Sequence, residues 1–192
     1  MSLNAVRGAY WRFKLQALVL LVLARREAAL QVFTAMLSRW PVDAYALASR
    51  AHLHAQLGMS DEALADAQAL TRAHPQRSAA DWFNLAFLLD EAGHHAEAEP
   101  AFRRAVLLDP KLDRAWYGLG VLLIRLQRFE EAIKALERNT ELQPMSPYGW
   151  YQLARVHVDR HEPEAARKII RHLKEFEPKV AAQLERETGL AV

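Results

Sequence analysis

The feature that most constrains this chain is a tryptophan and a proline that recur together every 34 residues. The three tryptophans and the three prolines that follow them at a fixed distance are Trp82, Trp116, Trp150, Pro110, Pro144 and Pro178. Between each tryptophan and its proline, apolar residues recur three or four positions apart, pause at a short polar stretch and then resume, which is the pattern of two amphipathic helices. The proline ends the second helix because it has no N–H to donate. The sequence therefore predicts a helix–turn–helix unit that is repeated in tandem.

Small residues stand at fixed places within these units. The first predicted helix carries Ala86, Gly120 or Ala154, and the second carries Ala98, Ala132 or Ala166. Short side chains at these places let the two helices of a unit approach closely. One helix pair cannot bury its own apolar face, so neighbouring pairs must stack and share a continuous core.

These residues resemble the tetratricopeptide repeat, whose pattern is W-x2-L-G-x2-Y, then A-x3-F, then P over 34 residues. Three units match without a gap from Trp82 to Pro178. Two upstream units are more divergent, and their residues in phase are Leu47, Ala51, Gly58, Ala63, Leu70 and Pro75, then Phe13, Ala17, Leu20, Ala29, Phe33, Met36 and Pro41. In the first of these, Arg50 and His54 stand where the pattern requires apolar residues.

The resemblance implies an all-α fold, a right-handed α-solenoid of about five helix-turn-helix units with a C-terminal capping helix. We expect Gly189 to end that last helix. The expected division is a basic N-terminal segment with a degenerate helix pair over 1–43, repeats over 44–78, 79–112, 113–146 and 147–180, and the capping helix over 181–192.

Composition and charge exclude several kinds of protein. The chain has no cysteine, which excludes disulfides, thiolate zinc sites and cysteine nucleophiles and favours a reducing compartment such as the cytoplasm. The formal net charge is +2, which is not the basic balance of a nucleic-acid binder, so no nucleic-acid partner is expected. The charge is uneven, because residues 1–26 hold five basic side chains and no acidic one.

No residue pattern indicates catalysis, a cofactor or a metal site. His157 and His161 have the four-residue spacing of helical metal ligands. However, His157 occupies the inward phase of Leu89 and Leu123, and His161 falls at the turn in the phase of Gly93. No serine, histidine and aspartate form a nucleophile–base arrangement, so we expect a protein that is not an enzyme and needs no cofactor.

In relatives with this repeat, the first helices line a concave groove where ligands lie. The resemblance places ten residues of this chain in that groove, namely Phe83, Asn84, Phe87, Arg114, Tyr117, Val121, Arg125, Tyr148, Tyr151 and Arg155. Tyrosine and arginine are prominent in interface energetics, so the expected partner is another protein, held as a peptide or helical segment with apolar anchors and some acidic character. In an alternative interpretation, Phe83 and Tyr117 only pack between neighbouring first helices.

A clamp for a terminal carboxylate, as co-chaperone relatives have, is not predicted. Asn84 and Arg114 match that clamp, but Ala48, His52 and Gly118 stand where further clamp residues are needed.

The N-terminal segment raises a separate question. The predicted helix Trp11–Leu23 is apolar on every side from Leu18 onward, and such a helix is normally covered on all sides. Three interpretations stay open: a hydrophobic end unit, a contact with a second copy or a partner helix through Leu18, Leu21 and Val22, or a membrane anchor or uncleaved signal. The uncharged run Leu15–Ala24 is about half the length that spans a bilayer.

The sequence thus predicts a non-catalytic adaptor or assembly factor in the cytoplasm. Two alternatives remain. One is a membrane-associated component of a secretion, pilus or envelope assembly system, tethered by the N-terminal helix. The other is an accessory subunit of a modifying enzyme such as a glycosyltransferase.

Overall fold

The computed structural model describes residues 3–192, with side chains from residue 6 onward. These residues form eleven helices and no strand. The chain divides into two compact units, the first ending at His94 and the second beginning at His95. The predicted all-α class is confirmed, as are the helix pairs and the single helix that follows them.

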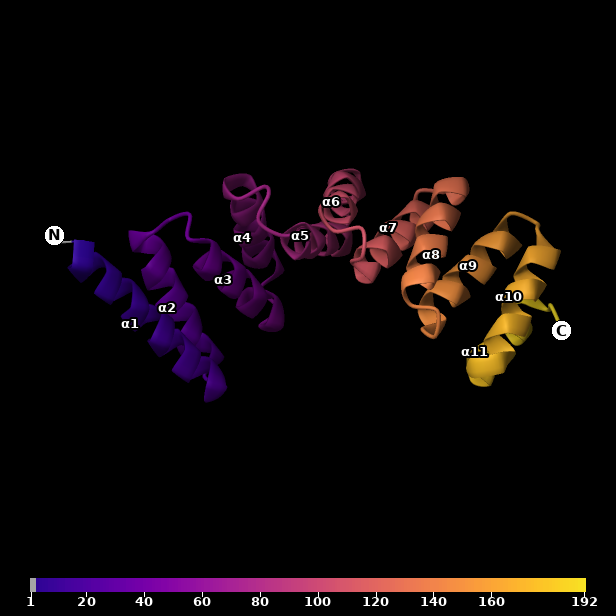
Figure 1. Ribbon diagram of the computed structural model, residues 1–192, viewed down its shortest axis with the longest axis horizontal. Helices are drawn as coiled ribbons and strands as arrows, with labels where there is room; N and C mark the ends of the chain where they lie inside the picture. The colour runs from indigo at the N-terminus through magenta and orange to yellow at the C-terminus, as the bar shows by residue number, and fades with distance from the viewer. Residues whose placement is uncertain (1–2) are drawn as a thin grey trace. The chain divides into compact units, whose positions relative to one another are not determined.

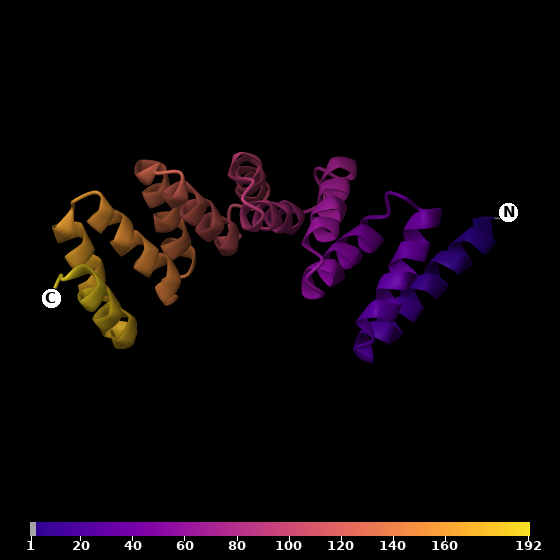
Figure 2. The ribbon, with the colours of Figure 1, turned by 180° about the vertical axis from the view of Figure 1, so that it is seen from behind.

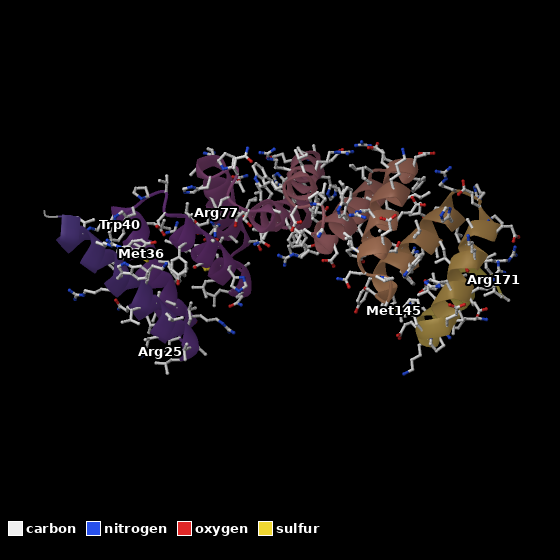
Figure 3. The ribbon with its side chains drawn as sticks, in the orientation of Figure 1. Arg25, Met36, Trp40, Arg77, Met145 and Arg171 are labelled. Atoms are coloured by element: carbon white, nitrogen blue, oxygen red, sulfur yellow. The ribbon has the colours of Figure 1, made fainter. Side chains whose placement is uncertain are left out.

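The first unit contains five helices, of which the first four form two successive antiparallel hairpins (Figure 1). Their bounds are α1 (Leu3–Val22), α2 (Arg26–Arg39), α3 (Ala44–Gln56), α4 (Ser60–Ala73) and α5 (Ala79–Glu91). Helix α1 begins eight residues earlier than the predicted Trp11, because Tyr10 and Phe13 continue its inward face and pack edge-on against Trp40, with ring centroids 5.2 and 6.1 Å apart. Figure 3 labels Trp40 and Met36 within this unit.

The second unit contains six helices (Figure 2). Their bounds are α6 (His95–Leu108), α7 (Asp113–Arg125), α8 (Phe129–Leu142), α9 (Pro147–Asp159), α10 (Pro163–Phe176) and α11 (Pro178–Thr188). Helix α11 packs on α10 and α9 through the buried side chains of Ala181 and Leu184. It ends as predicted at Gly189, whose φ of 69° is left-handed and whose N–H donates to the Glu185 carbonyl. The helix begins three residues before the expected position 181, since a proline is well accommodated in the first turn.

A hydrogen bond joins each recurring tryptophan to a recurring proline. Each indole Nε1–H donates to the carbonyl oxygen of the proline that follows the preceding second helix. The three bonds are Trp82 to Pro75 at 2.9 Å, Trp116 to Pro110 at 3.0 Å and Trp150 to Pro144 at 2.9 Å. One extra residue lies between Pro75 and Trp82, and the same bond still forms. Each bond therefore ties the loop after one repeat to the first helix of the next.

The small residues of the repeat are buried, and the two glycines of α7 lie in close contact with other helices. A Cβ added to Gly120 would lie 2.7 Å from Cγ of Leu136, and one added to Gly118 would lie 2.5 Å from a ring carbon of Phe102. The alanines at the other predicted positions are all fully buried, namely Ala86, Ala98, Ala132, Ala154 and Ala166. The predicted close approach of helices is confirmed.

The turn inside each helix pair has the same backbone structure five times. One residue of each turn is left-handed: Ala24 (φ 55°), Gly58 (φ 75°), Gly93 (φ 78°), Gln127 (φ 58°) and His161 (φ 59°). The residue after it donates its N–H to a carbonyl five positions back, as Arg128 does to Leu123 at 2.9 Å. This is the Schellman motif, which pairs the last carbonyls of a helix. His161 is thus a turn residue, as predicted from its phase.

The two polar residues in the divergent repeat are explained by a third. Asp66 of α4 is buried, and its carboxylate accepts two hydrogen bonds from Arg50, at 2.8 and 2.7 Å. His54 lies on the other side, with Nδ1 3.1 Å from the same carboxylate. An ionic cluster therefore replaces the apolar contact that the repeat pattern expects between α3 and α4.

Candidate functional site

A hollow of about 210 Å³ lies among α3, α4 and α5 of the first unit. It is lined by Ala48, Ala51, His52, Ala55, Ala67, Leu70, Asp81, Asn84, Phe87 and Leu88. Most of these side chains are apolar, and three carry polar groups. The site is therefore an apolar recess with a few polar groups, which is the usual make-up of a binding site.

Short side chains on α3 create this hollow. Ala48, Ala51 and Ala55 follow one another at spacings of three and four residues, so they lie on one face of the helix. Helix α5 supplies Asn84 and Phe87 on the facing side. Phe87 is 50% exposed although it is a large apolar side chain, so a ligand that enters the hollow can cover its ring.

The polar groups at the hollow are partly held by their neighbours. Both carboxylate oxygens of Asp81 accept hydrogen bonds from Nη1 of Arg77, at 2.8 and 2.7 Å. Burial raises the pKa of Asp81, and the nearby Arg77 guanidinium only partly offsets this effect. Nε2 of His52 lies 2.8 Å from Nε2 of Gln56. Asn84 is exposed, and its amide can both donate and accept a hydrogen bond.

Three of the residues predicted for the groove lie in this unit. Asn84 and Phe87 line the hollow. Phe83 is half-buried and stacks on Phe87, with ring centroids 6.4 Å apart. Sequence reasoning missed the part played by the alanines of α3, because it looked for side chains that bind and not for the space left by short ones. The signal was present as the regular spacing of Ala48, Ala51 and Ala55.

The seven other predicted groove residues lie in the second unit and fall into two groups. The exposed ones are Arg114, Arg125, Tyr148 and Arg155, and the half-buried ones are Tyr117, Val121 and Tyr151. Tyr117 and Tyr151 pack against the core of this unit. The two tyrosines therefore contribute to the packing of the helices they belong to.

Tyr151 also makes a contact that the repeat pattern does not contain. Its hydroxyl donates to the carboxylate of Glu187 on α11, and the Arg155 guanidinium lies 5.9 Å from its ring centroid. The hydrogen bond to Glu187 raises the pKa of the Tyr151 hydroxyl, and burial adds to this effect. The capping helix thus uses Tyr151 as an attachment point.

A wider hollow of about 690 Å³ lies among α8, α9 and α10. Its walls include Trp150 and His172, whose rings meet at a centroid distance of 4.7 Å. They also carry Glu137, Glu141 and Lys168. This mixture of both charges around a partly exposed indole defines no single ligand chemistry, so the hollow of the first unit is the stronger candidate.

His157 and His161 both have roles within the fold. Nδ1 of His157 lies 2.7 Å from a carboxylate oxygen of Glu162, and His161 occupies the left-handed turn position. Among residues 3–192, no three histidine, cysteine or acidic side chains gather in a way that could hold a metal ion.

The residues of α1 that were predicted to contact a second copy or a partner do not share one face. Leu18 and Val22 are exposed, whereas Leu21 packs against the core of the first unit. None of the described helices is both long enough and apolar enough to cross a bilayer.

Comparison with known proteins places this architecture among tandem helical repeats. Residues 14–78 and 83–147 match the family model of the tetratricopeptide repeat. The structure is similar to that of MamA, with 16% identity over 94% of this chain and 95% of MamA and a TM-score of 0.80. It is also similar to YrrB, described as a TPR protein with an unusual peptide-binding site, with 20% identity over 88% of each chain and a TM-score of 0.80.

A third similar structure is a tetratricopeptide repeat protein from Parabacteroides merdae. It shares 18% identity over 95% of this chain and 74% of its own length, with a TM-score of 0.82. No curated protein matches the chain by sequence. At these identities, the similar structures establish the fold.

Proposed function

Because the chain belongs to the tetratricopeptide repeat family, whose model matches more than half of it, we propose that it is a non-catalytic adaptor or assembly factor that binds a segment of another protein. Stacked helical repeats present surfaces that serve for binding. The absence of cysteine from the sequence is consistent with action in the cytoplasm, a reducing compartment.

The observation that carries the proposal is the hollow among α3, α4 and α5. Its volume of about 210 Å³ is below the roughly 300–1,000 Å³ typical of sites that enclose a whole small molecule. A recess of this size suits one large apolar side chain that projects from a longer segment. Phe87 and the alanine row of α3 supply the apolar walls for such an anchor.

Polar groups around the hollow suit a polypeptide. The Asn84 amide can accept from a backbone N–H of the bound segment or donate to its C=O. The Asn84 amide gives the bound segment orientation, while the apolar anchor supplies most of the affinity.

The test fills the hollow without changing any charge. Random linear peptides are displayed, those that bind the full chain are selected, and their affinities are compared for the wild type and for Ala55→Trp. Ala55 is exposed at the edge of the hollow, so an indole there takes the place of the anchor. We expect affinity to fall at least about tenfold, which corresponds to about 1.4 kcal/mol.

The matched control is Ala65→Trp, which adds the same indole to an exposed position of α4 that does not line the hollow. It should leave affinity unchanged. Phe87→Ala should weaken binding as Ala55→Trp does, since it removes a wall of the hollow. Equal affinities for the wild type and for both hollow variants would contradict the proposal.

A further inference from the structure

Helix α1 exposes an apolar stripe on the side that faces away from the rest of the first unit. We define the outer stripe as Trp11, Leu15, Leu18, Val19 and Val22. Between 48% and 78% of each of these side chains is exposed. Trp11, Leu15, Leu18 and Val22 follow one another at spacings of four, three and four residues, so they form one continuous row on the helix.

The outer stripe is distinct from the face of α1 that builds the core. Ala17 is fully buried, and Tyr10, Phe13, Leu20 and Leu21 pack against the core of the first unit. The helix is therefore apolar on two opposite sides, of which the unit covers one. Large exposed apolar patches on proteins commonly mark sites of interaction.

Basic side chains border the outer stripe. With about 3.6 residues per turn, Arg7 falls beside Trp11 and Leu18 on one edge, and Arg12 falls beside Val19 on the other. Both arginines are exposed, and neither forms an ion pair with any described residue.

The end of the stripe is also basic. Arg25 and Arg26 follow it, with Arg25 at the tip of the α1–α2 hairpin (Figure 3). Lys14 does not belong to this basic border, because its Nζ makes a cation–π contact with Tyr45, 4.1 Å from the ring centroid. Residues 1–26 contain no acidic side chain that could neutralise these charges.

We propose that the outer stripe docks on an anionic membrane surface, with α1 lying in the headgroup region parallel to the bilayer. Apolar side chains that include tryptophan, bordered by arginine, are the composition of helices that lie in this region. The apolar row enters the acyl boundary, and the bordering guanidinium groups meet lipid phosphates. This mode of binding needs no helix that spans the bilayer.

Charge argues against a second copy of the chain as the occupant. A parallel pair of α1 helices joined through the outer stripe would place the Arg12 edge of one copy beside the Arg7 edge of the other. An antiparallel pair centred on the stripe would bring the hairpin tip of one copy, with Arg25 and Arg26, toward the Arg7 end of the other. Both arrangements gather the arginines of two copies around an apolar contact, and residues 1–26 hold no acidic side chain to balance them, whereas anionic headgroups supply the opposite charge.

The experiment is flotation of the full chain with phosphatidylcholine vesicles, with or without phosphatidylglycerol. We expect the wild type to float only with the anionic vesicles. The double variant Leu18→Gln/Val22→Gln should lose binding at least about tenfold, because two apolar side chains no longer enter the boundary. Arg7→Gln/Arg12→Gln keeps the stripe intact and should also weaken binding, and added salt should weaken wild-type binding.

Two controls separate the lipid contact from a general effect. Leu107→Gln/Met145→Gln removes two apolar side chains that are equally exposed in the second unit, and it should bind as the wild type does. Tryptophan emission should shift to the blue on anionic vesicles, and Trp11→Phe should abolish that shift. Circular dichroism of each variant establishes that the fold is kept.

Three results would overturn the proposal. The first is equal flotation with neutral and anionic vesicles, or none with either. The second is unchanged binding by both stripe and arginine variants. The third is a stable dimer in light scattering that Leu18→Gln/Val22→Gln dissociates, which would assign the stripe to a second copy.

Discussion

At the residue scale, the recurring positions of the repeat have separate physical reasons. The tryptophan N–H makes the same hydrogen bond, to the proline carbonyl, in all three regular repeats. The turn position is set by backbone geometry instead. It is left-handed in all five helix pairs but is glycine in only two of them.

A glycine at position 127 should therefore stabilise the protein. Gln127 has a φ of 58°, a region that costs a residue with a Cβ about 1–2 kcal/mol. Glycine avoids that cost but loses more chain entropy on folding. We expect Gln127→Gly to raise the free energy of unfolding by about 0.5–1 kcal/mol, measured by urea denaturation.

The control is the same change inside a helix. Gln31→Gly alters an exposed position of α2 and should lower the free energy of unfolding by about 1 kcal/mol. If Gln127→Gly lowered the free energy of unfolding as much as Gln31→Gly does, the left-handed turn would carry no strain.

At the element scale, neighbouring helices are joined by polar contacts as well as by packing. In the first unit, Arg50, His54 and Asp66 join α3 to α4. In the second, Glu99 and Arg103 of α6 alternate with Arg128 and Glu131 at the start of α8, with N–O distances of 2.6–2.8 Å. The repeat pattern predicts neither cluster, because it records only the apolar positions.

Removal of the Asp66 carboxylate from the first cluster should strongly destabilise the protein. Asp66→Ala leaves Arg50 and His54 facing each other in a mostly buried place. We expect the free energy of unfolding to fall by about 3 kcal/mol, near the lower end for a broken buried ion pair, since Arg50 still reaches water. Asp61→Ala, at an exposed position in the first turn of the same helix, should cost less than about 1 kcal/mol. Similar losses for both variants would rule out a special role of the cluster.

The second cluster should make the free energy of unfolding depend on pH in the acidic range. Burial by itself raises the pKa of Glu99, but hydrogen bonds from Arg103 and Arg128 outweigh it, so this pKa lies below the ordinary value of 4.5. A carboxyl with a lowered pKa stabilises the folded state above its ordinary pKa, and this contribution is lost as the pH falls through the folded value.

The corresponding measurement is the urea midpoint between pH 6 and pH 3, where the wild type should lose more stability than Glu99→Gln. The variant lacks the titrating group, so part of the acid dependence should disappear. Parallel curves for the two proteins would show that the cluster does not respond to pH in this range.

At the scale of the whole molecule, periodicity predicted the elements well and the site only in part. Apolar spacing and proline positions predict helix pairs because they report on burial, which the stacking of repeats determines. The hollow depends on short side chains of α3 facing Phe87 of α5, which lies far along the chain. Likewise, the hydrogen bond of Tyr151 to Glu187 depends on where α11 packs, which the repeat pattern does not record.

The two compact units differ in what they offer a partner. The first holds the apolar hollow and the outer stripe, on different elements, and the second presents exposed arginines and Tyr148. The proposed binding of a protein segment and the proposed contact with a lipid surface use separate residues. Variants of the hollow should therefore leave vesicle binding intact, and variants of the outer stripe should leave peptide binding intact.

The central claim is that an apolar side chain of a partner enters the hollow of the first unit. Alanine methyl resonances report on this directly, because Ala48, Ala51 and Ala55 line the hollow while Ala65 and Ala73 of α4 do not. Titration of the full chain with a peptide selected by display should shift the three hollow methyls and leave the two control methyls in place. Saturated binding that leaves the hollow methyls unmoved would contradict the account.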